Sequence, residues 1–251
     1  MEDRQTDVDP RRLARFLRQR LEACRRFGWE PPVRPPRRAA AAAASRPRHP
    51  PASPVDGSRD NSPAERSRRE ALLEEARHEV AACRRCGLCR SRTQTVFGVG
   101  DPCARLLFVG EAPGFEEDRR GEPFVGPAGQ LLDDIIRAMR LAREDVYIAN
   151  IVKCRPPNNR NPAAEEVASC ITYLRRQIEI ISPEVLCALG SVAARTLLET
   201  TASVGALRGR FHEFQGIPLR VTYHPAYLLR NPADKRKTWQ DVQSIMERLG
   251  L

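Results

Sequence analysis

Four cysteines are arranged in two pairs whose spacing suits a metal site. Cys83 and Cys86 form a CxxC pair, whereas fifteen residues separate Cys154 from Cys170. A two-residue gap lets two thiolates meet one ion or one corner of a cluster, and the distant pair would close the site through the tertiary fold. Cys89 makes a competing CxxC with Cys86. The spacing alone leaves tetrahedral zinc, an iron–sulfur cluster and ordinary free thiols open.

The remaining cysteines have simpler interpretations. Cys187 lies in an apolar run, where a cysteine packs as a small hydrophobe, and Cys24 and Cys103 belong to no ligand pattern. The N-terminal residues lack the layout of a secretory signal, and no run approaches the roughly 18 apolar residues of a membrane helix. We therefore expect a cytoplasmic protein, in which metal ligation is the leading use of eight reduced cysteines.

A second group of chemically capable residues follows four short apolar runs. These runs, typical of buried parallel strands, are residues 106–109, 146–149, 185–189 and 219–222. The segments at their carboxyl ends are residues 110–114, 150–154, 190 and 224–226. Ligands of parallel sheets bind outside the carboxyl ends of the strands. We therefore expect the chemistry among these four segments.

Helical patterns lie before, between and after the runs. They cover residues 68–82, 129–141, 162–181, 191–198 and 232–249. Strands that alternate with helices indicate an α/β fold, with a parallel sheet covered on both faces.

The first part of the chain differs from the rest. Residues 1–68 hold one possible Arg-rich amphipathic helix, residues 9–27, followed by a run rich in Pro, Arg, Ala and Ser. Such a run buries too little apolar surface to offset its ordering entropy, so we expect a mostly disordered extension before a domain at residues 69–251. The net charge of +10 favours a polyanion partner. Arginines of the extension would then hold DNA nonspecifically, although a solvated tail is the simpler interpretation.

Four motifs in order resemble the family 4 uracil-DNA glycosylases. They are VGEAPGFEED (residues 109–118), PFVGPAG (123–129), VYIANIVKCRPP (146–157) and HPAYLLR (224–230). The resemblance runs from about residue 83 to residue 249 without a large gap and leaves out residues 1–68. It implies a three-layer α/β/α sandwich around a four-stranded parallel sheet. It also implies a [4Fe–4S] cluster bound by Cys83, Cys86, Cys154 and Cys170.

The resemblance further implies how uracil, flipped out of the DNA, would be held. Phe124 would stack on the flipped ring, and the Asn150 amide would donate to uracil O4 and accept from N3–H. His224 would donate a hydrogen bond to uracil O2 as negative charge develops there. A core phenylalanine, a strand-capping asparagine and a structural histidine are the respective alternatives.

The acidic residue that would assist cleavage of the glycosidic bond is harder to assign. Better-known uracil glycosylases have an aspartate where this chain has Ala112, beside Glu111. We expect Glu111 to shape the site and Glu117 to exclude the C5-methyl of thymine, unless either is a solvated loop charge. Backbone N–H groups from Gly110 to Gly114 would contact uracil or phosphate.

At the rim, Leu228 and Leu229 resemble a wedge that enters the gap left by the flipped base, and Arg230 would hold a flanking phosphate. An Arg-rich, His-containing insertion that traps DNA covalently in a related branch is absent after Cys154. We therefore expect ordinary turnover by a monomeric, nucleoid-associated repair enzyme that releases free uracil.

Three other interpretations remain at this point. A noncatalytic iron–sulfur DNA-binding module would use the cysteines but not Phe124, Asn150 and His224 together. A zinc-binding interaction protein fits poorly with the continuous α/β pattern. A glycosylase that prefers another deaminated base, such as hypoxanthine, would differ only in its substrate.

Overall fold

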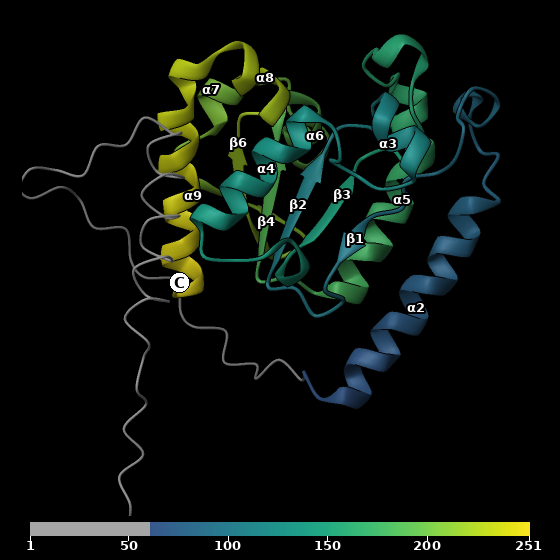
Figure 1. Cartoon of the computed structure of the whole chain (residues 1–251), viewed down its shortest axis with the longest axis horizontal. Coiled ribbons are helices and arrows are strands. Elements are labelled where there is room, and N and C mark those ends of the chain that lie inside the picture. The colour runs from purple at the N-terminus through teal and green to yellow at the C-terminus, as the bar shows by residue number, and fades with distance from the viewer. Residues whose placement is uncertain (1–60) are drawn as a thin grey trace, which may run out of the picture.

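The computed structural model describes residues 61–251, which form a sheet with helices packed on both of its faces (Figure 1). The expected helix at residues 9–27 and residues 1–60 of the expected disordered extension lie outside the described residues. Residues 63–68, which were expected to belong to that extension, are helical. The boundary between extension and domain at residues 68 and 69 stays a prediction.

The sheet has six strands in the order β1-β3-β2-β4-β6-β5. They are β1 (Val99–Gly100), β2 (Leu106–Gly110), β3 (Tyr147–Asn150), β4 (Val185–Leu189), β5 (Phe211–Phe214) and β6 (Ile217–Thr222). The four central strands are parallel, as expected, and the two edge strands are antiparallel additions that the sequence analysis did not predict. Gly110 pairs with Asn150, so the two strands end side by side.

The edge strands have local causes. Gln215 and Gly216, the two residues between β5 and β6, both have positive φ, at 52° and 79°. This is the combination that a type I′ hairpin turn requires. β1 has only two residues, too few for the apolar alternation that identifies a strand.

Seven of the eight described α-helices divide between the two faces of the sheet. The eight helices are α2 (Pro63–Ala81), α3 (Phe115–Arg120), α4 (Pro127–Ala138), α5 (Ala164–Ile181), α6 (Gly190–Leu198), α7 (Val204–Leu207), α8 (Pro225–Arg230) and α9 (Lys235–Leu249). Side chains of α2, α5, α6 and α7 share one core with the sheet, those of α4, α8 and α9 share the other, and α3 contributes to neither core. The expected three-layer sandwich is therefore confirmed. No helix within residues 61–251 has the length and apolarity needed to cross a membrane.

The helix ends differ from the expected ones by at most five residues, and two differences from the expected elements have clear local causes. α2 begins at Pro63 rather than residue 68, because Ser62 caps its N-terminus and proline suits the first helical position. Residues 224–226, expected as a loop, are the start of α8, with His224 as its N-cap and Pro225 in its first turn.

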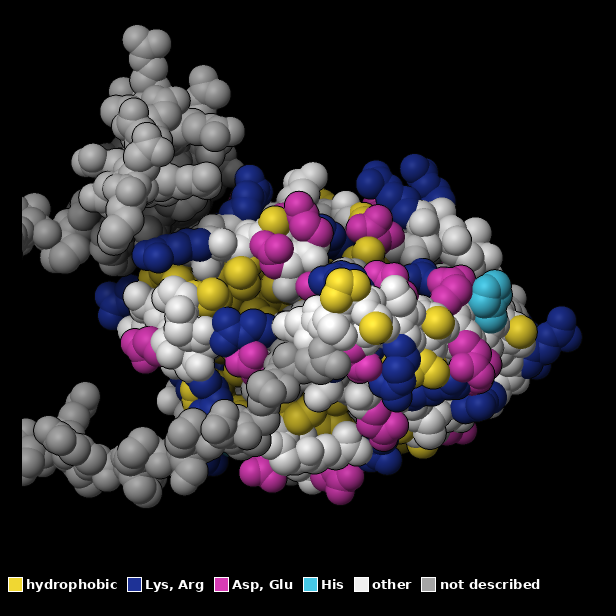
Figure 2. Space-filling model, turned by 90° about the horizontal axis from the view of Figure 1, so that it is seen from below, with side chains coloured by type: hydrophobic (Ala, Val, Ile, Leu, Met, Phe, Trp, Pro, Cys, Tyr) yellow, Lys and Arg dark blue, Asp and Glu magenta, His cyan; other side chains and the backbone are white. Residues whose placement is uncertain are grey.

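Charges of both signs are mixed on the described surface. Figure 2 shows basic and acidic side chains interspersed over the face seen from below. Ion pairs such as Arg105–Glu184 and Arg143–Asp133 cancel part of this charge. Residues 1–60 supply six of the ten net positive charges of the chain.

A buried carboxylate joins α9 to the sheet. Asp241 is fully buried and accepts hydrogen bonds from Arg208 Nε at 2.9 Å, Arg220 Nη2 at 3.1 Å and Thr222 Oγ1 at 2.9 Å. The Gly209 N–H donates to it as well, at 3.2 Å. The carboxylate therefore holds β6 and the loop after α7 together beside the carboxyl end of the sheet.

We expect Asp241→Asn to lower the free energy of unfolding by about 3–5 kcal/mol, because the buried Arg220 and the partly buried Arg208 would lose their counter-charge. Glu74→Gln is the control, since exposed Glu74 pairs, within residues 61–251, only with its α2 neighbours and its loss should cost under about 1 kcal/mol. Urea denaturation of both variants measures the difference. Equal effects of the two substitutions would contradict this role of Asp241.

Candidate active site

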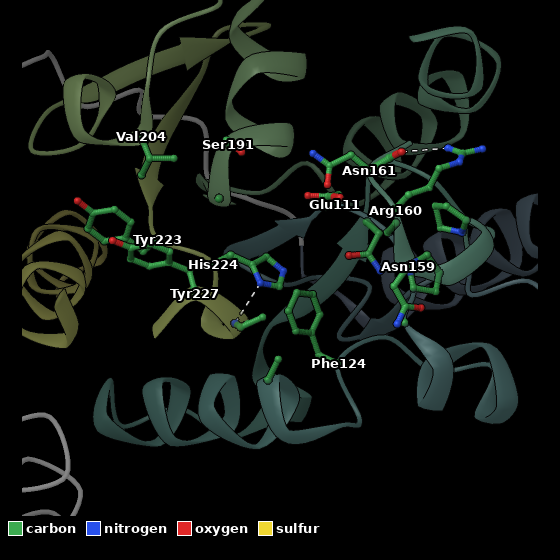
Figure 3. A pocket seen from close by; sticks show the side chains of 18 of the residues that line it. Glu111, Phe124, Asn159, Arg160, Asn161, Ser191, Val204, Tyr223, His224 and Tyr227 are labelled. Carbon is green, nitrogen blue, oxygen red and sulfur yellow. Dashed lines mark hydrogen bonds between the residues drawn. The ribbon is translucent and has the colours of Figure 1, made fainter. Parts of the chain in front are cut away.

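A cavity of about 740 Å³ lies where the central strands end. Its walls come from the segments after β2, β3, β4 and β6, together with α7 and the loop that precedes α4 (Figure 3). Of the expected site residues, those that line it are Glu111, Ala112, Gly114, Glu117, Phe124, Asn150, His224 and Arg230. The structure thus brings these residues together at the carboxyl edge of the sheet, and their chemical roles stay predictions.

His224 is held as a neutral ring with a defined proton position. Its Nδ1 accepts a hydrogen bond from the Ala226 N–H at 3.1 Å, so the proton of the neutral ring resides on Nε2. Burial lowers the pKa of His224 to about 4, with a further contribution from the positive charge of Arg230. The imidazole therefore stays uncharged at neutral pH and is a hydrogen-bond donor through Nε2.

Phe124 lies beside this ring. The two ring centroids are 5.5 Å apart and the planes are tilted by 32°. Figure 3 shows the two rings next to each other. Phe124 has a φ of 54°, an uncommon conformation for a residue that is not glycine. It is only 6% exposed and its ring packs against the core under α4, yet it also lines the cavity. Such strained backbone clusters at functional sites.

Asn150 provides an unsatisfied polar group. Its side chain is 2% exposed, and its Oδ1 has no hydrogen-bond partner within residues 61–251. Buried polar atoms are rarely left without a partner, so this oxygen suits a ligand donor. Gly110 lies against the side chains of Asn150 and Phe124. A Cβ at this position would be 2.3 Å from Asn150 Oδ1 and 2.6 Å from Phe124 Cζ.

The two glutamates have different surroundings. Glu117 accepts hydrogen bonds from the backbone N–H groups of Gly114, Val125 and Gly126, at 3.0–3.1 Å. It thus ties the turn after β2 to the segment that carries Phe124. Glu111 is half-buried in the cavity wall, and its burial raises the pKa of its carboxyl group.

One expected contact residue is misplaced. Leu228 is a residue of α8 whose side chain is fully buried in the core, so it cannot enter a DNA helix from this position. Leu229, by contrast, is 46% exposed and follows the cavity-lining Tyr227. The expectation was wrong for Leu228 because consecutive residues of a helix point in different directions, so Leu228 and Leu229 cannot both face the DNA.

Several lining residues were missed by the sequence analysis. Tyr223 and Tyr227 stack with centroids 4.9 Å apart beside His224, and their positions next to the histidine were a usable signal. The other missed residues are brought in by tertiary folding, without a local signal. They are Asn159, Asn161, Ser191, Ser203, Val204 and Gly205, whereas Pro113, Ala128, Pro156, Gly190 and Ala226 lie within strand-end segments and motifs identified from the sequence.

A second, smaller cavity gathers cysteines from distant segments. Cys83, Cys86, Cys154 and Cys170 line it, and Cys89 lies among them. Cys187 is buried in β4, as expected for a small hydrophobe.

Hydrogen-bond donors point at two of these sulfurs. Arg92 Nη1 lies 3.0 Å from Cys154 Sγ, and the Lys153 N–H lies 3.3 Å from Cys170 Sγ. Burial raises the pKa of the Cys154 thiol to about 11 despite Arg92. No group of three or more His, Cys, Asp or Glu side chains in the described part of the chain has the geometry for a single metal ion. Thiols that line one cavity, with N–H donors directed at two of the sulfurs, have the ligand chemistry that an iron–sulfur cluster uses.

Lys153 connects the two cavities. Its buried Nζ donates to the Asn150 carbonyl at 2.9 Å and to Gln177 Oε1 at 2.6 Å, while its backbone N–H faces Cys170. The segment that follows β3 is therefore held at both ends.

We expect His224 to titrate near pH 4 and to carry its proton on Nε2, as measured by nitrogen-15 NMR with His224→Gln used for assignment. The unfolded imidazole, with a pKa near 6.5, takes up a proton more readily than the folded one. The contribution of His224 to the free energy of unfolding is therefore complete above pH 6.5 and falls as pH drops toward 4. A midpoint near 6.5 in the folded protein would contradict the buried neutral ring.

Comparison with known proteins agrees with this arrangement. Residues 97–243 match the model of the uracil DNA glycosylase superfamily. A type-4 uracil-DNA glycosylase of Archaeoglobus fulgidus is 43% identical over 71% of this chain and 94% of its own length. One from Thermotoga maritima is 45% identical over 70% and 93%.

A type-5 uracil-DNA glycosylase of Pyrobaculum aerophilum is less similar, at 32% identity over 59% of this chain and 72% of the relative. The higher identity to the type-4 relatives than to the type-5 relative agrees with the four motifs, which resemble the family 4 enzymes. The chain belongs to the uracil DNA glycosylase superfamily and, within it, to the type-4 uracil-DNA glycosylases.

Proposed function

We propose that this protein flips uracil out of DNA and hydrolyses its N-glycosidic bond, which releases free uracil and leaves an abasic site. The observation that carries the proposal is the meeting of His224, Phe124 and Asn150 in one cavity at the carboxyl edge of the sheet. A module that only binds DNA has no use for this combination. Uracil inside a duplex is out of reach, so extrusion must precede the chemistry.

Phe124 and Asn150 would select the base. The Phe124 face offers a stacking platform, and the unpartnered Asn150 Oδ1 would accept the N3–H of uracil while the amide N–H₂ donates to O4. Cytosine presents the reverse pattern, an acceptor at N3 and a donor at N4, so the same amide orientation would reject it.

His224 would stabilise the departing base. Cleavage places negative charge on uracil, and the Nε2–H of His224 would donate to its O2. Because Nδ1 already accepts the Ala226 N–H, the proton is directed to Nε2 without any rearrangement. A neutral donor is sufficient, since it stabilises the anion without having to protonate it.

We assign different roles to the two glutamates. Glu111, half-buried in the cavity wall, would face the positive charge that develops on the sugar. Glu117 would act as a positioning residue, because its carboxylate is occupied by three backbone donors. It would exclude the C5-methyl of thymine by keeping the Gly114 and Val125 segments close together. Arg230 and the backbone N–H groups of this wall would contact flanking phosphate.

Cys83, Cys86, Cys154 and Cys170 would hold a [4Fe–4S] cluster. When bound, this group would tie the segment after α2 to α5 and to the segment after β3. Arg92 and the Lys153 N–H would donate hydrogen bonds to its cysteine sulfurs. The substrate would be uracil-containing DNA, single- or double-stranded, handled by a monomer at the nucleoid.

We expect His224→Ala to reduce single-turnover release of uracil from a uracil-containing oligonucleotide by about 100- to 1,000-fold, because one preorganised donor to the leaving group is lost. His78→Ala is the matched control, since His78 is an exposed residue of α2. Unaltered release by His224→Ala would remove the histidine from the mechanism. A folded wild type that binds DNA but releases no base would favour the noncatalytic module.

Replacement of any one of the four proposed ligand cysteines by serine should remove iron and acid-labile sulfide and lower the melting temperature. Cys89→Ser should retain both, although Cys89 lies in the same cavity. Iron and sulfide analysis of anaerobically purified protein checks this. Full iron content in a Cys170→Ser variant, or its loss in Cys89→Ser, would reassign the ligands.

A further inference from the structure

One large apolar side chain lies in solvent directly beside the cavity. Phe115 is 53% exposed, the largest value among the exposed large hydrophobic residues of the described chain. It is the first residue of α3 and follows Pro113 and Gly114, which both line the cavity. Consecutive Cα atoms are 3.8 Å apart, so the backbone of Phe115 lies next to the cavity wall formed by Gly114.

A guanidinium group covers one part of this ring. Arg155 Cζ lies 5.1 Å from the centroid of Phe115, within the range of a cation–π contact. The Arg155 Nε donates to Asn159 Oδ1 at 2.7 Å, and Asn159 also lines the cavity. The aromatic ring and the cation therefore come from two different walls and meet beside the cavity.

The backbone keeps this pair in place without burying it. Glu117 caps the first turn of α3 through the Gly114 N–H, which orients the helix start. Arg155 stands between Cys154, in the second cavity, and the buried Pro156. Arg160, the next cation along this loop, is instead engaged by both oxygens of Glu166. Arg155 is thus the cation of this loop that stands next to an exposed aromatic face.

We propose that Phe115 and Arg155 form a second base-stacking subsite, which takes the unpaired nucleotide adjacent to the flipped uracil in single-stranded DNA. This inference rests on the proposed function and extends it to a neighbouring nucleotide. Aromatic rings at the edge of a basic groove bind single strands because every base has a stacking face. The guanidinium supplies both a stacking partner and a charge for the adjoining phosphate.

We assign this subsite to single-stranded DNA because only there is the base next to the flipped uracil unpaired and exposed. In a duplex the base next to a flipped uracil keeps its own pair and its stacking neighbour, so it is not free to cover a side chain beside the cavity. In a single strand the neighbouring base has no complement and can turn onto the ring. The pair should therefore contribute to single-strand binding and little to duplex binding.

The test uses the full chain and an oligonucleotide with one 2′-fluoro-2′-deoxyuridine, an analogue that resists cleavage of the glycosidic bond. Fluorescence anisotropy gives Kd for the single strand and for its duplex. We expect Phe115→Ala to raise Kd for the single strand by at least about fivefold and to leave the duplex within about twofold. Phe115→Tyr should bind like the wild type, because an aromatic face is retained. Leu251→Ala, at an exposed residue of the C-terminus, is the surface control.

Photochemical cross-linking identifies the contact directly. With 5-iododeoxycytidine on either side of the uracil analogue, ultraviolet light should join one flanking base to the peptide that contains Phe115. The cross-link should be lost in Phe115→Ala. Equal weakening of single-strand and duplex binding, or no weakening and no cross-link at either position, would overturn the subsite.

Uracil release separates this inference from the proposed function. If Phe115→Ala raises KM on single strands and keeps kcat, the subsite is supported, since Phe115 would act in binding alone. If wild type releases uracil and Phe115→Ala behaves identically, the subsite fails and the glycosylase function stands. If wild type releases none, the function fails, whereas the cross-link would still report the contact.

Discussion

A side chain at Gly110 would lie within 2.3 Å of Asn150 Oδ1 and 2.6 Å of the Phe124 ring, so the site requires that this position has none. The restriction follows from the register of the sheet, because Gly110 and Asn150 pair at the ends of β2 and β3. The amide that would read the base and the ring that would stack on it can approach each other only across this glycine. The same edge receives His224 after β6, since all four central strands end there.

Several backbone devices preserve this close approach. Phe124 has a positive φ, and Glu117 holds the neighbouring N–H groups of Val125 and Gly126. Gly190, with φ of 89°, lies where a Cβ would be 2.9 Å from His224 Cβ. The positive φ of Phe124 and the conformational freedom that Gly190 loses on folding cost free energy locally, and the packing of the two cores must offset this cost. The pocket is thus assembled largely by backbone geometry, which leaves the side chains free for a ligand.

The parallel strands, most of the helices and the location of the site could be predicted from the sequence, because buried strands are continuous apolar runs and ligands gather at their carboxyl ends. The two-residue β1 was not predictable, because it has no periodicity of its own. Leu228 shows a second limit. A motif places it beside the pocket, but only the orientation of α8 shows that it points into the core and that Leu229 is exposed. Val204 and Gly205 of α7 join the wall through tertiary packing alone.

The central claim is that this geometry selects uracil as the base to be removed. The most direct measurement is single-turnover release of free base by the wild type from oligonucleotides that carry uracil, hypoxanthine, thymine or cytosine at one position. The account predicts fast release of uracil and none of cytosine or thymine. Hypoxanthine should be slower by orders of magnitude, because its N1–H and O6 can meet Asn150 but it is a larger purine and has no O2 to accept a hydrogen bond from His224. Release of hypoxanthine as fast as uracil, or of cytosine at any comparable rate, would contradict it.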